Sequence, residues 1–330
     1  MRHQRYLKLL EKDVVLIDGA LGTELEKAIA TPLLPWSLDG LVLHPDQTQR
    51  IHERYLHAGV DVITTNAFRT NHRTLKQVDW EAVVLPDAAP AALKSLWQRH
   101  AWEELEETLT RVAVKIAQCA RAQSGRQTTC IAGNLAPLED CFSPQSAPSK
   151  ADAYLEHLNK ARTLATAGVD LLLIETMNTI HEADAALDAA LETGLPVWVS
   201  FVCRGGPELF SGEPLVDAVR MVLNKNHPSI AVVMVNCCFP EEIKLALPVL
   251  ADALGGTTLR FGAYANLEAP NTSGVWRRRT ALNARTYLKQ VRDWIALGAS
   301  VVGGCCGSTP DDLALLCAGL REQAPLDPAS

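Results

Sequence analysis

The sequence lacks any long hydrophobic run. No apolar stretch among its 330 residues approaches the ~18 residues that a membrane-spanning helix needs. Residues 1–10 also lack the uninterrupted apolar segment and small-residue cleavage site of a secretory signal. We therefore expect a protein that neither crosses a membrane nor has a membrane as its partner.

The chain also lacks an excess of positive charge. Its formal net charge of -7 disfavours a nucleic-acid-binding surface, so we expect a small-molecule partner. Nine cysteines, an odd number, together with the absence of a secretory signal favour a reduced, cytoplasmic protein. No internal repeat or low-complexity segment interrupts the sequence, and we expect one domain over residues 1–330. Nothing in the sequence indicates an oligomeric state.

Eight short apolar runs rich in β-branched residues alternate with longer stretches of helical periodicity. Continuous apolar strands alternating with helices imply a parallel sheet that is buried on both faces, and eight such strands favour closure into a barrel. We therefore predict an α/β fold, a (β/α)8 barrel of the TIM type. The runs begin near Val14, Val62, Thr129, Val169, Val197, Ala231, Thr258 and Val301.

Two segments are longer than a minimal barrel requires. Between the second and third strands, an insertion from Val83 to His100 precedes an amphipathic run from Glu103 to Arg121 that should be the barrel helix. The other segment, residues 269–280, follows the seventh strand and ends in Arg277-Arg278-Arg279, which we interpret as a solvated charge run. Active-site lids come from loops of this kind, but so do solvated excursions, and the Val83 to His100 insertion lies where a lid could sit.

Three cysteines stand where apolar runs stop: Cys237 after the sixth strand and the pair Cys305-Cys306 after the eighth. The ends of barrel strands are where this fold builds its active site. Three converging thiolates would bind Zn²⁺ and leave its fourth tetrahedral position open, as in a catalytic site. Buried thiols or a vicinal disulfide are the structural alternatives. Cys238 adjoins the cluster but should point away from it, because side chains alternate along a strand.

Polar or glycine-rich motifs follow most of the other predicted strands. Such a concentration at one end of the barrel is hard to obtain from structural needs alone, and it indicates a shared pocket. The motifs are Asp18-Gly-Ala-Leu-Gly-Thr-Glu24, Thr64-Thr-Asn-Ala-Phe-Arg-Thr-Asn71, Gly133-Asn-Leu-Ala-Pro137, Glu175-Thr176, Asn236-Cys237-Cys238, Tyr264-Ala-Asn266 and Gly303-Gly-Cys-Cys-Gly307.

From about Val14 to Cys317 the sequence resembles the zinc-dependent homocysteine S-methyltransferases, a family that includes S-methylmethionine:homocysteine and betaine:homocysteine methyltransferases and the homocysteine domain of cobalamin-dependent methionine synthase. Its most specific motifs are Asp18-Gly-Ala-Leu-Gly-Thr-Glu-Leu25, Val235-Asn-Cys237 and Gly303-Gly-Cys-Cys-Gly-Ser-Thr-Pro310.

The resemblance implies a role for each of several residues. Cys237, Cys305 and Cys306 would bind zinc, and Asp18 and Glu175 would hold the homocysteine ammonium group. The backbone amides of Ala20, Leu21 and Gly22 would bind its carboxylate, and Asn266 would lie near the metal. From the residues alone, Asp18 could instead cap the next helix, and Glu175 could pair with a lysine or arginine of the barrel.

The resemblance also implies an enzyme that methylates homocysteine to methionine. We expect a sulfonium donor, S-methylmethionine or S-adenosylmethionine. Arg69 stands where the betaine enzymes carry a tyrosine, which disfavours betaine, and no folate or cobalamin module accompanies the barrel in these 330 residues. Two other interpretations remain: a methyltransferase acting on another small thiol or selenol, and a zinc-binding or thiol-sensing protein without turnover.

Overall fold

Eight strands form one parallel sheet that curls into a barrel. The computed structural model describes residues 2–29, 34–83, 91–270 and 276–321. In the sheet the strands follow the order β1-β10-β7-β6-β5-β4-β3-β2. Each begins within two residues of its predicted start, so the predicted α/β barrel is confirmed. The strands are β1 (Val15–Leu16), β2 (Val62–Thr64), β3 (Cys130–Leu135), β4 (Leu171–Met177), β5 (Val197–Phe201), β6 (Ile230–Asn236), β7 (Arg260–Ala265) and β10 (Val301–Gly304).

The barrel closes between its first two strands. Ile17 and Val62 form a parallel bridge there. The Asp18 amide donates to the Val62 carbonyl at 2.9 Å, and the Asp61 amide donates to the Leu16 carbonyl at 2.7 Å. The seam between β1 and β2 has one bridged residue pair, whereas the ladders between the other neighbouring strands have two to five.

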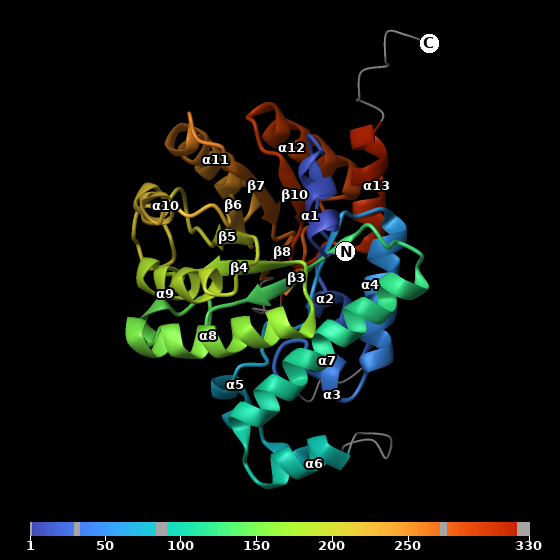
Figure 1. The fold of residues 1–330 in the computed structure, drawn as a ribbon. Coiled ribbons are helices and arrows are strands. Elements are labelled where there is room, and N and C mark those ends of the chain that lie inside the picture. The colour runs from blue at the N-terminus through green and yellow to red at the C-terminus, as the bar shows by residue number, and fades with distance from the viewer. Residues whose placement is uncertain (1, 30–33, 84–90, 271–275, 322–330) are drawn as a thin grey trace.

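Each barrel strand is followed by a helix on the outside of the sheet, as Figure 1 shows. Gly168 ends α8 with a positive φ of 105°, as its position before β4 predicts. In order, the outer helices are α4 (Pro45–Ala58), α7 (Trp102–Gln123), α8 (Lys150–Ala167), α9 (Ile180–Leu191), α10 (Leu215–Asn224), α11 (Pro240–Leu254), α12 (Ala284–Ala296) and α13 (Pro310–Arg321).

Shorter elements occupy the connections. The first loop carries α2 (Gly22–Ala28) and α3 (Asp39–Val42), and the third carries the 3-10 turn η2 (Pro144–Ser146). The second loop holds α5 (His72–Lys76), the 3-10 turn η1 (Trp80–Ala82) and α6 (Ala91–Gln98). After β7, strands β8 (Glu268–Pro270) and β9 (Trp276–Arg278) pair antiparallel.

Apolar side chains fill the barrel, and the amino-terminal helix covers its lower end. Helix α1 (Arg2–Leu10) contributes Tyr6 and Leu9 to the same buried cluster as the inward side chains of the strands. The indole of Trp198 donates to the Tyr6 hydroxyl at 3.1 Å. Below the strands, Asp170 forms ion pairs with Arg5 at 2.8 Å and with Arg121 at 2.7 Å. This end of the barrel is therefore closed, and the opposite end carries the loops.

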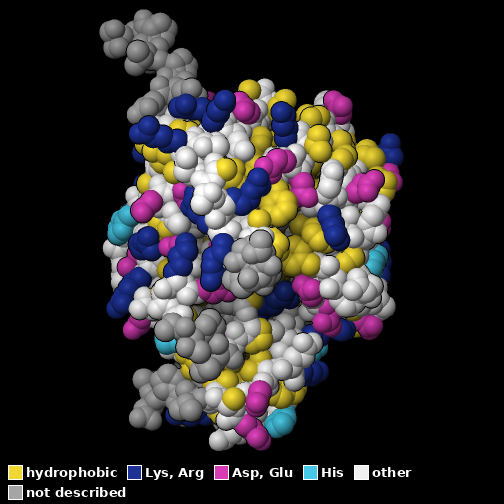
Figure 2. All heavy atoms as spheres, turned by 180° about the vertical axis from the view of Figure 1, so that it is seen from behind, with side chains coloured by type: hydrophobic (Ala, Val, Ile, Leu, Met, Phe, Trp, Pro, Cys, Tyr) yellow, Lys and Arg dark blue, Asp and Glu magenta, His cyan; other side chains and the backbone are white. Residues whose placement is uncertain are grey.

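The surface shows no segregation of charge on the face drawn in Figure 2. Lys and Arg side chains are interspersed there with Asp and Glu, and hydrophobic side chains gather near the middle. None of the described helices combines the length and the apolar character needed to cross a membrane.

Candidate active site

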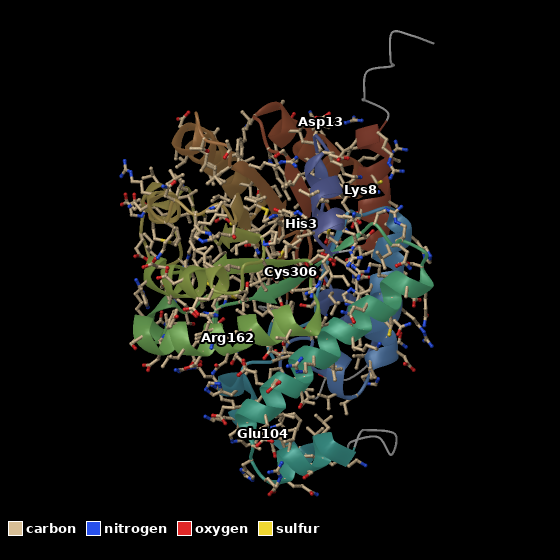
Figure 3. All side chains as sticks on the ribbon, in the orientation of Figure 1. His3, Lys8, Asp13, Glu104, Arg162 and Cys306 are labelled. Carbon is tan, nitrogen blue, oxygen red and sulfur yellow. The ribbon has the colours of Figure 1, made fainter. Side chains whose placement is uncertain are left out.

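The three predicted cysteines meet at the carboxyl end of the barrel. Their sulfur atoms all lie within 4.8 Å of one another, and the Cys237 and Cys306 sulfurs are 3.9 Å apart. Figure 3 places Cys306 near the centre of the molecule, whereas Glu104 and Arg162 lie on outer helices. The backbone sets this arrangement: the Cys237 amide donates to the Tyr264 carbonyl at 3.1 Å and the Cys305 amide to the Ala265 carbonyl at 3.0 Å. Strand β7 thus holds both cysteine segments in place.

The spacing of the sulfurs fits a tetrahedral metal. Zinc–sulfur bonds of about 2.3 Å at tetrahedral angles put two sulfur ligands about 3.8 Å apart. All three cysteines are free thiols. Cys305 and Cys306 therefore do not form the vicinal disulfide that was one structural alternative. Hydrogen bonds from the Cys237 and Cys306 thiols lower the pKa of Cys305 well below its usual value. The residues present can therefore supply three sulfur ligands, at least one of them readily ionised.

Backbone strain is concentrated beside this cluster. Cys237 has φ +54° and Thr176 has φ +60°, in the left-handed region that favours glycine. The buried Asn236 side chain connects the two strand ends, accepting from the Thr176 amide at 2.9 Å and donating to the Thr176 hydroxyl at 2.8 Å. Residues held in this way are commonly found at functional sites.

Cys238 points away from the cluster, as predicted. Its buried sulfur accepts a hydrogen bond from the Cys203 amide at 3.0 Å and donates to the Asn236 carbonyl at 3.1 Å. It lies outside the group of three sulfurs. The fourth position of a metal bound there would not be filled by this neighbouring thiol.

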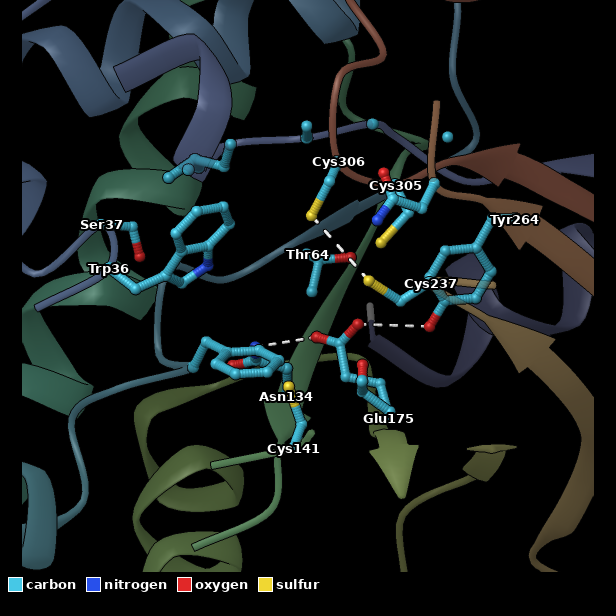
Figure 4. Close-up of a pocket in the computed structure, with 18 of the residues that line it drawn as sticks. Trp36, Ser37, Thr64, Asn134, Cys141, Glu175, Cys237, Tyr264, Cys305 and Cys306 are labelled. Carbon is cyan, nitrogen blue, oxygen red and sulfur yellow. Dashed lines mark hydrogen bonds between the residues drawn. The ribbon is translucent and has the colours of Figure 1, made fainter. Parts of the chain in front are cut away.

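Glu175 projects from β4 into the pocket beside the cysteines (Figure 4). Its carboxyl group accepts from the Asn134 amide group at 2.9 Å and from the Tyr264 hydroxyl at 3.2 Å. Lys160 is near enough to lower the pKa of Glu175 slightly, but its ammonium group donates to the Ala67 carbonyl at 2.6 Å, and no described cation forms an ion pair with Glu175. Burial raises the pKa of Glu175 to about 7. The alternative of an ion pair with a barrel lysine or arginine is therefore not realised among the described residues.

Asp18 lies at the end of β1 on the same pocket. Its two carboxyl oxygens accept from the amide of Thr64 at 2.8 Å and from the Thr64 hydroxyl at 3.0 Å. It does not cap the following helix, because α2 has Leu21 at its N-cap and no side-chain cap. Burial raises the pKa of Asp18 to about 8, and the nearby Glu175 adds to the shift. Two buried carboxyl groups thus face one pocket without a described cation to pair with.

The glycine-rich turn after Asp18 is only partly free to bind a ligand. The Ala20 amide donates to the Ser308 hydroxyl at 3.1 Å, and that hydroxyl donates to the Cys305 carbonyl at 2.7 Å. Ser308 thus ties the first loop to the cysteine turn. Leu21 and Gly22 line the pocket, and Gly22 begins α2, whose first amides have no partner within the helix.

Asn266 also lines the pocket and is buried. Its side-chain oxygen accepts from the Glu268 amide at 2.9 Å. That bond orients the side chain and tightens the turn that leads from β7 into the hairpin.

The sequence indicated no role for several side chains that line the outer part of the pocket. The cavity, about 530 Å³, lies within the size range of small-molecule sites. Trp36, opposite the cysteines in Figure 4, covers the start of α2 so closely that a Cβ added at Gly22 would lie 2.7 Å from its ring. Phe142 and Trp276 stack with ring centroids 6.3 Å apart and planes 15° apart. These side chains come from loops far apart in sequence, so no local pattern could reveal them.

The described part of the insertion between the second and third strands does not line the pocket. Among the described residues, none from 72 to 83 or from 91 to 100 lines the pocket; residues 84–90 lie outside the described part. Trp97 of α6 packs against Trp80, with ring centroids 5.9 Å apart. Helix α6 therefore buries its apolar face beside α7, away from the strand ends (Figure 1).

Only part of the predicted arginine run is solvated charge. Arg278 forms an ion pair with Asp312, and Arg279 forms one with Glu241 at 2.7 Å. Arg277, by contrast, is exposed to solvent as predicted, at the outer part of the pocket. Alternate residues of a strand face opposite sides, which separates Arg277 from Arg278.

Comparison with known proteins agrees with this site. The family model described as homocysteine S-methyltransferase matches residues 15–320. The protein of that name from Escherichia coli (strain K12) is 29% identical over 93% of this chain and 96% of its own length. A selenocysteine methyltransferase from Astragalus bisulcatus is 24% identical, covering 90% of each chain.

Solved structures show the same architecture. The crystal structure of the homocysteine methyltransferase MmuM from Escherichia coli, in its metallated form, has a TM-score of 0.74 to this chain at 25% identity. It covers 97% of this chain and 100% of its own. Because the family model spans all eight barrel strands, the chain belongs to the homocysteine S-methyltransferase family and is an enzyme of the methyltransferase class.

Proposed function

We propose that this enzyme transfers a methyl group from a sulfonium donor, S-methylmethionine or S-adenosylmethionine, to the thiol of homocysteine in a zinc-dependent reaction that yields methionine. The observation that carries the proposal is the juxtaposition of three cysteine sulfurs at metal-ligand spacing with two buried carboxyl groups that lack a described cation. Cys237, Cys305 and Cys306 would bind the metal.

The thiol must lose its proton before it can attack. A free alkyl thiol has a pKa near ~8.5 and is mostly protonated at neutral pH. When bound, zinc supplies the positive charge that stabilises the substrate sulfur as a thiolate, so no side chain is needed as a general base. Asn266 has its side-chain oxygen beside the cysteine turn. It is our candidate for the group that would occupy the fourth ligand position of the metal until homocysteine takes its place.

The chain's own residues position the amino-acid end of homocysteine. Asp18 and Glu175 would share its ammonium group, whose charge would return both buried carboxyl groups to their ionised form. The carboxylate would bind at the first turn of α2, where Leu21 and Gly22 offer amides, while the Ala20 amide is occupied by Ser308. Thr64 and Asn134 orient the two acidic side chains through the hydrogen bonds already described.

The methyl transfer itself needs alignment more than acid–base catalysis. The thiolate lone pair forms the new sulfur–carbon bond while the methyl–sulfur bond of the donor breaks, and its electron pair stays on the donor sulfur as a neutral thioether. No proton has to reach this leaving group. Holding the two substrates in line can contribute ~7 to 11 kcal/mol of barrier reduction.

A donor screen tests the proposal directly. Zinc-loaded protein would be incubated with homocysteine and, in turn, S-methylmethionine, S-adenosylmethionine and betaine, with product detection by mass spectrometry. We expect methionine from at least one sulfonium and none from betaine. Selenocysteine and other small thiols in place of homocysteine would show whether the acceptor is correct. Absence of methylation with every pair would leave a zinc-binding or thiol-sensing protein.

X-ray absorption at the zinc edge gives a second, independent measurement. We expect three sulfur neighbours and one oxygen or nitrogen before substrate is added, and four sulfurs after homocysteine is added. Methionine, a neutral thioether, should cause no such change. Four sulfurs before substrate would indicate a closed structural site and contradict the proposal.

A further inference from the structure

Asn236 is the last residue of β6 and directly precedes Cys237. Val232 and Met234, earlier on the same strand, belong to the apolar cluster inside the barrel. Because side chains alternate along a strand, Asn236 continues this inward row, now with a polar side chain that is fully buried. A buried amide group is costly unless it is hydrogen-bonded, so the partners of Asn236 indicate its role.

Both ends of the Asn236 side chain have buried partners. The oxygen accepts from the Thr176 amide at 2.9 Å and from the Ser200 hydroxyl at 2.7 Å. The nitrogen donates to the Thr176 hydroxyl at 2.8 Å. A backbone amide can only donate, so the bond from the Thr176 amide fixes which end of the side chain is the oxygen. Asn236 is therefore held in one orientation, with its nitrogen available as a donor beside the cysteines.

One of these partners controls the direction of Glu175. Thr176 follows Glu175 and has φ +60°, which is costly for a β-branched residue. The pairing of β4 with β5 shifts in register between Ile174 and Met177, and an irregularity of this kind changes the direction in which side chains point. By bonding to both the amide and the hydroxyl of Thr176, Asn236 stabilises the backbone conformation in which Glu175 faces the pocket.

Asn236 also acts on the cysteine cluster. It is joined directly to Cys237, whose backbone has φ +54°. Hydrogen bonds from Cys237 and Cys306 lower the pKa of the Cys305 thiol, and the Asn236 side chain adds to this lowering. A hydrogen-bond donor beside a metal ligand orients that ligand and tunes its affinity for the metal. Asn236 thus contacts two of the three sulfur-bearing residues, one through the chain and one through its side chain.

We propose that Asn236 is a positioning residue for both halves of the site: it orients the metal ligands Cys237 and Cys305, and it directs Glu175 toward the homocysteine ammonium group through Thr176. One side chain thereby sets how far the sulfur end of the substrate lies from its amino end. Ser200 supports this role by bonding to the Asn236 oxygen. The inference rests on the proposed function, which assigns these two halves.

Zinc affinity tests the cysteine half without any turnover. Competition with a chromogenic chelator, in the absence of substrate, should show that N236A binds zinc about tenfold more weakly than the wild type. S200A should have a smaller effect in the same direction. N71A is the matched control, because Asn71 is equally buried but caps α5, accepting from the Thr74 amide at 2.9 Å. We expect N71A to bind zinc as the wild type does.

Steady-state kinetics at saturating zinc test the Glu175 half. N236A should raise the KM for homocysteine about fivefold, because the hydrogen bonds that hold Thr176 are lost. The KM for the methyl donor should not change. In the double variant N236A/T176G, glycine adopts a positive φ without strain, so the KM for homocysteine should fall back toward the wild-type value. Zinc affinity should stay low in this double variant.

Each half can fail separately. Wild-type zinc affinity in N236A would overturn the role of Asn236 at the cysteines. An unchanged KM for homocysteine in N236A, or a raised KM that T176G does not lower, would overturn its action through Thr176. Equal losses in N236A and N71A would show that Asn236 is only structural. A wild-type protein that binds zinc but never methylates homocysteine would contradict the proposed function, and the zinc titrations would still decide the cysteine half.

Discussion

Asp170 and Glu175 lie near opposite ends of strand β4, and both carboxyl groups are buried. Asp170, at the lower end, has two arginine partners and accepts a further hydrogen bond from the Ile131 amide at 2.9 Å. Glu175, at the upper end, has as hydrogen-bond partners among the described residues the neutral groups of Asn134 and Tyr264. One strand thus carries a neutralised charge at one end and an unneutralised one at the other.

The contrast between these two carboxyl groups distinguishes a residue that stabilises the fold from a residue suited to bind a ligand. In the folded protein, a buried carboxylate paired with arginines stabilises the fold, because removal of one partner would leave an uncompensated buried charge. A buried carboxyl group without a cation costs folding free energy, and it is retained where a ligand supplies the missing charge. In barrels of this kind the lower end is associated with stability and the upper end with catalysis.

The strongest test of the upper end is Cys305→Ala. Removing one of three sulfur ligands should reduce the metal content from about one zinc per chain to near zero and abolish methyl transfer, while circular dichroism remains that of a folded barrel. Cys238→Ala is the matched control, since Cys238 is buried beside the cluster but points away from it. Full zinc content in Cys305→Ala, measured by elemental analysis, would show that the ligand assignment is wrong.

Asp170→Asn tests the lower end. Loss of the carboxylate leaves Arg5 and Arg121 without their shared partner, and we expect the free energy of unfolding to fall by about 3 kcal/mol. Zinc content should not change. Asp217→Asn, which breaks an exposed pair with Arg220, should cost less than about 0.5 kcal/mol. Denaturant titration measures both variants, and equal effects would contradict the contrast between buried and exposed pairs.

Glu175→Gln should affect substrate binding and leave the metal in place. Removing the negative charge that faces the homocysteine ammonium group should raise the KM for homocysteine roughly 30-fold, which corresponds to about 2 kcal/mol. In the double variant with Asp18→Asn, the increase in the KM for homocysteine should be smaller than the product of the two single effects, because both side chains would bind one ammonium group. An unchanged KM in steady-state kinetics would remove Glu175 from the substrate site.

Asp18→Asn should make the metal-free protein more stable at pH 8. Burial raises the pKa of Asp18 to about 8 in the folded state, against 3.8 as its ordinary value. The folded protein therefore binds more protons than the unfolded chain between these pH values, so the unfolding free energy falls as pH rises. Asparagine removes this loss. We therefore expect the unfolding free energy to gain on the order of a few kcal/mol at pH 8, and this gain to disappear below about pH 4. Thermal unfolding at both pH values measures it.

The strands could be predicted because each is a continuous apolar run between glycine-rich or polar segments, as at Val197 to Phe201. The positions of the cysteines and Asp18 at the pocket could be predicted for a related reason: side chains directly after parallel barrel strands gather at one end of the barrel. The orientation of Cys238 followed from strand alternation alone.

Contacts between distant loops could not be predicted in this way. The Ser308 hydroxyl, which occupies the Ala20 amide, and the stacking of Phe142 on Trp276 depend on how the loops fold over one another. The place of helix α6 depends on a contact of this kind too. Its position in the sequence was compatible with a lid or with a solvated excursion, but Trp97 packs against Trp80 beside the outer helix, and burial there decides where this helix lies.

The short seam between β1 and β2 has a consequence for motion. Because one bridge and two flanking backbone hydrogen bonds close the barrel there, local opening should begin at this seam, and amide hydrogen exchange at Asp18 should be faster than in β5 or β6. The Asp18 carboxyl group bonds across the seam to Thr64, so the residue that would bind the substrate ammonium also holds the first strand to the second. Homocysteine binding as proposed would therefore be thermodynamically coupled to closure of the barrel, and we expect substrate to slow exchange at the seam while most of the barrel is unaffected.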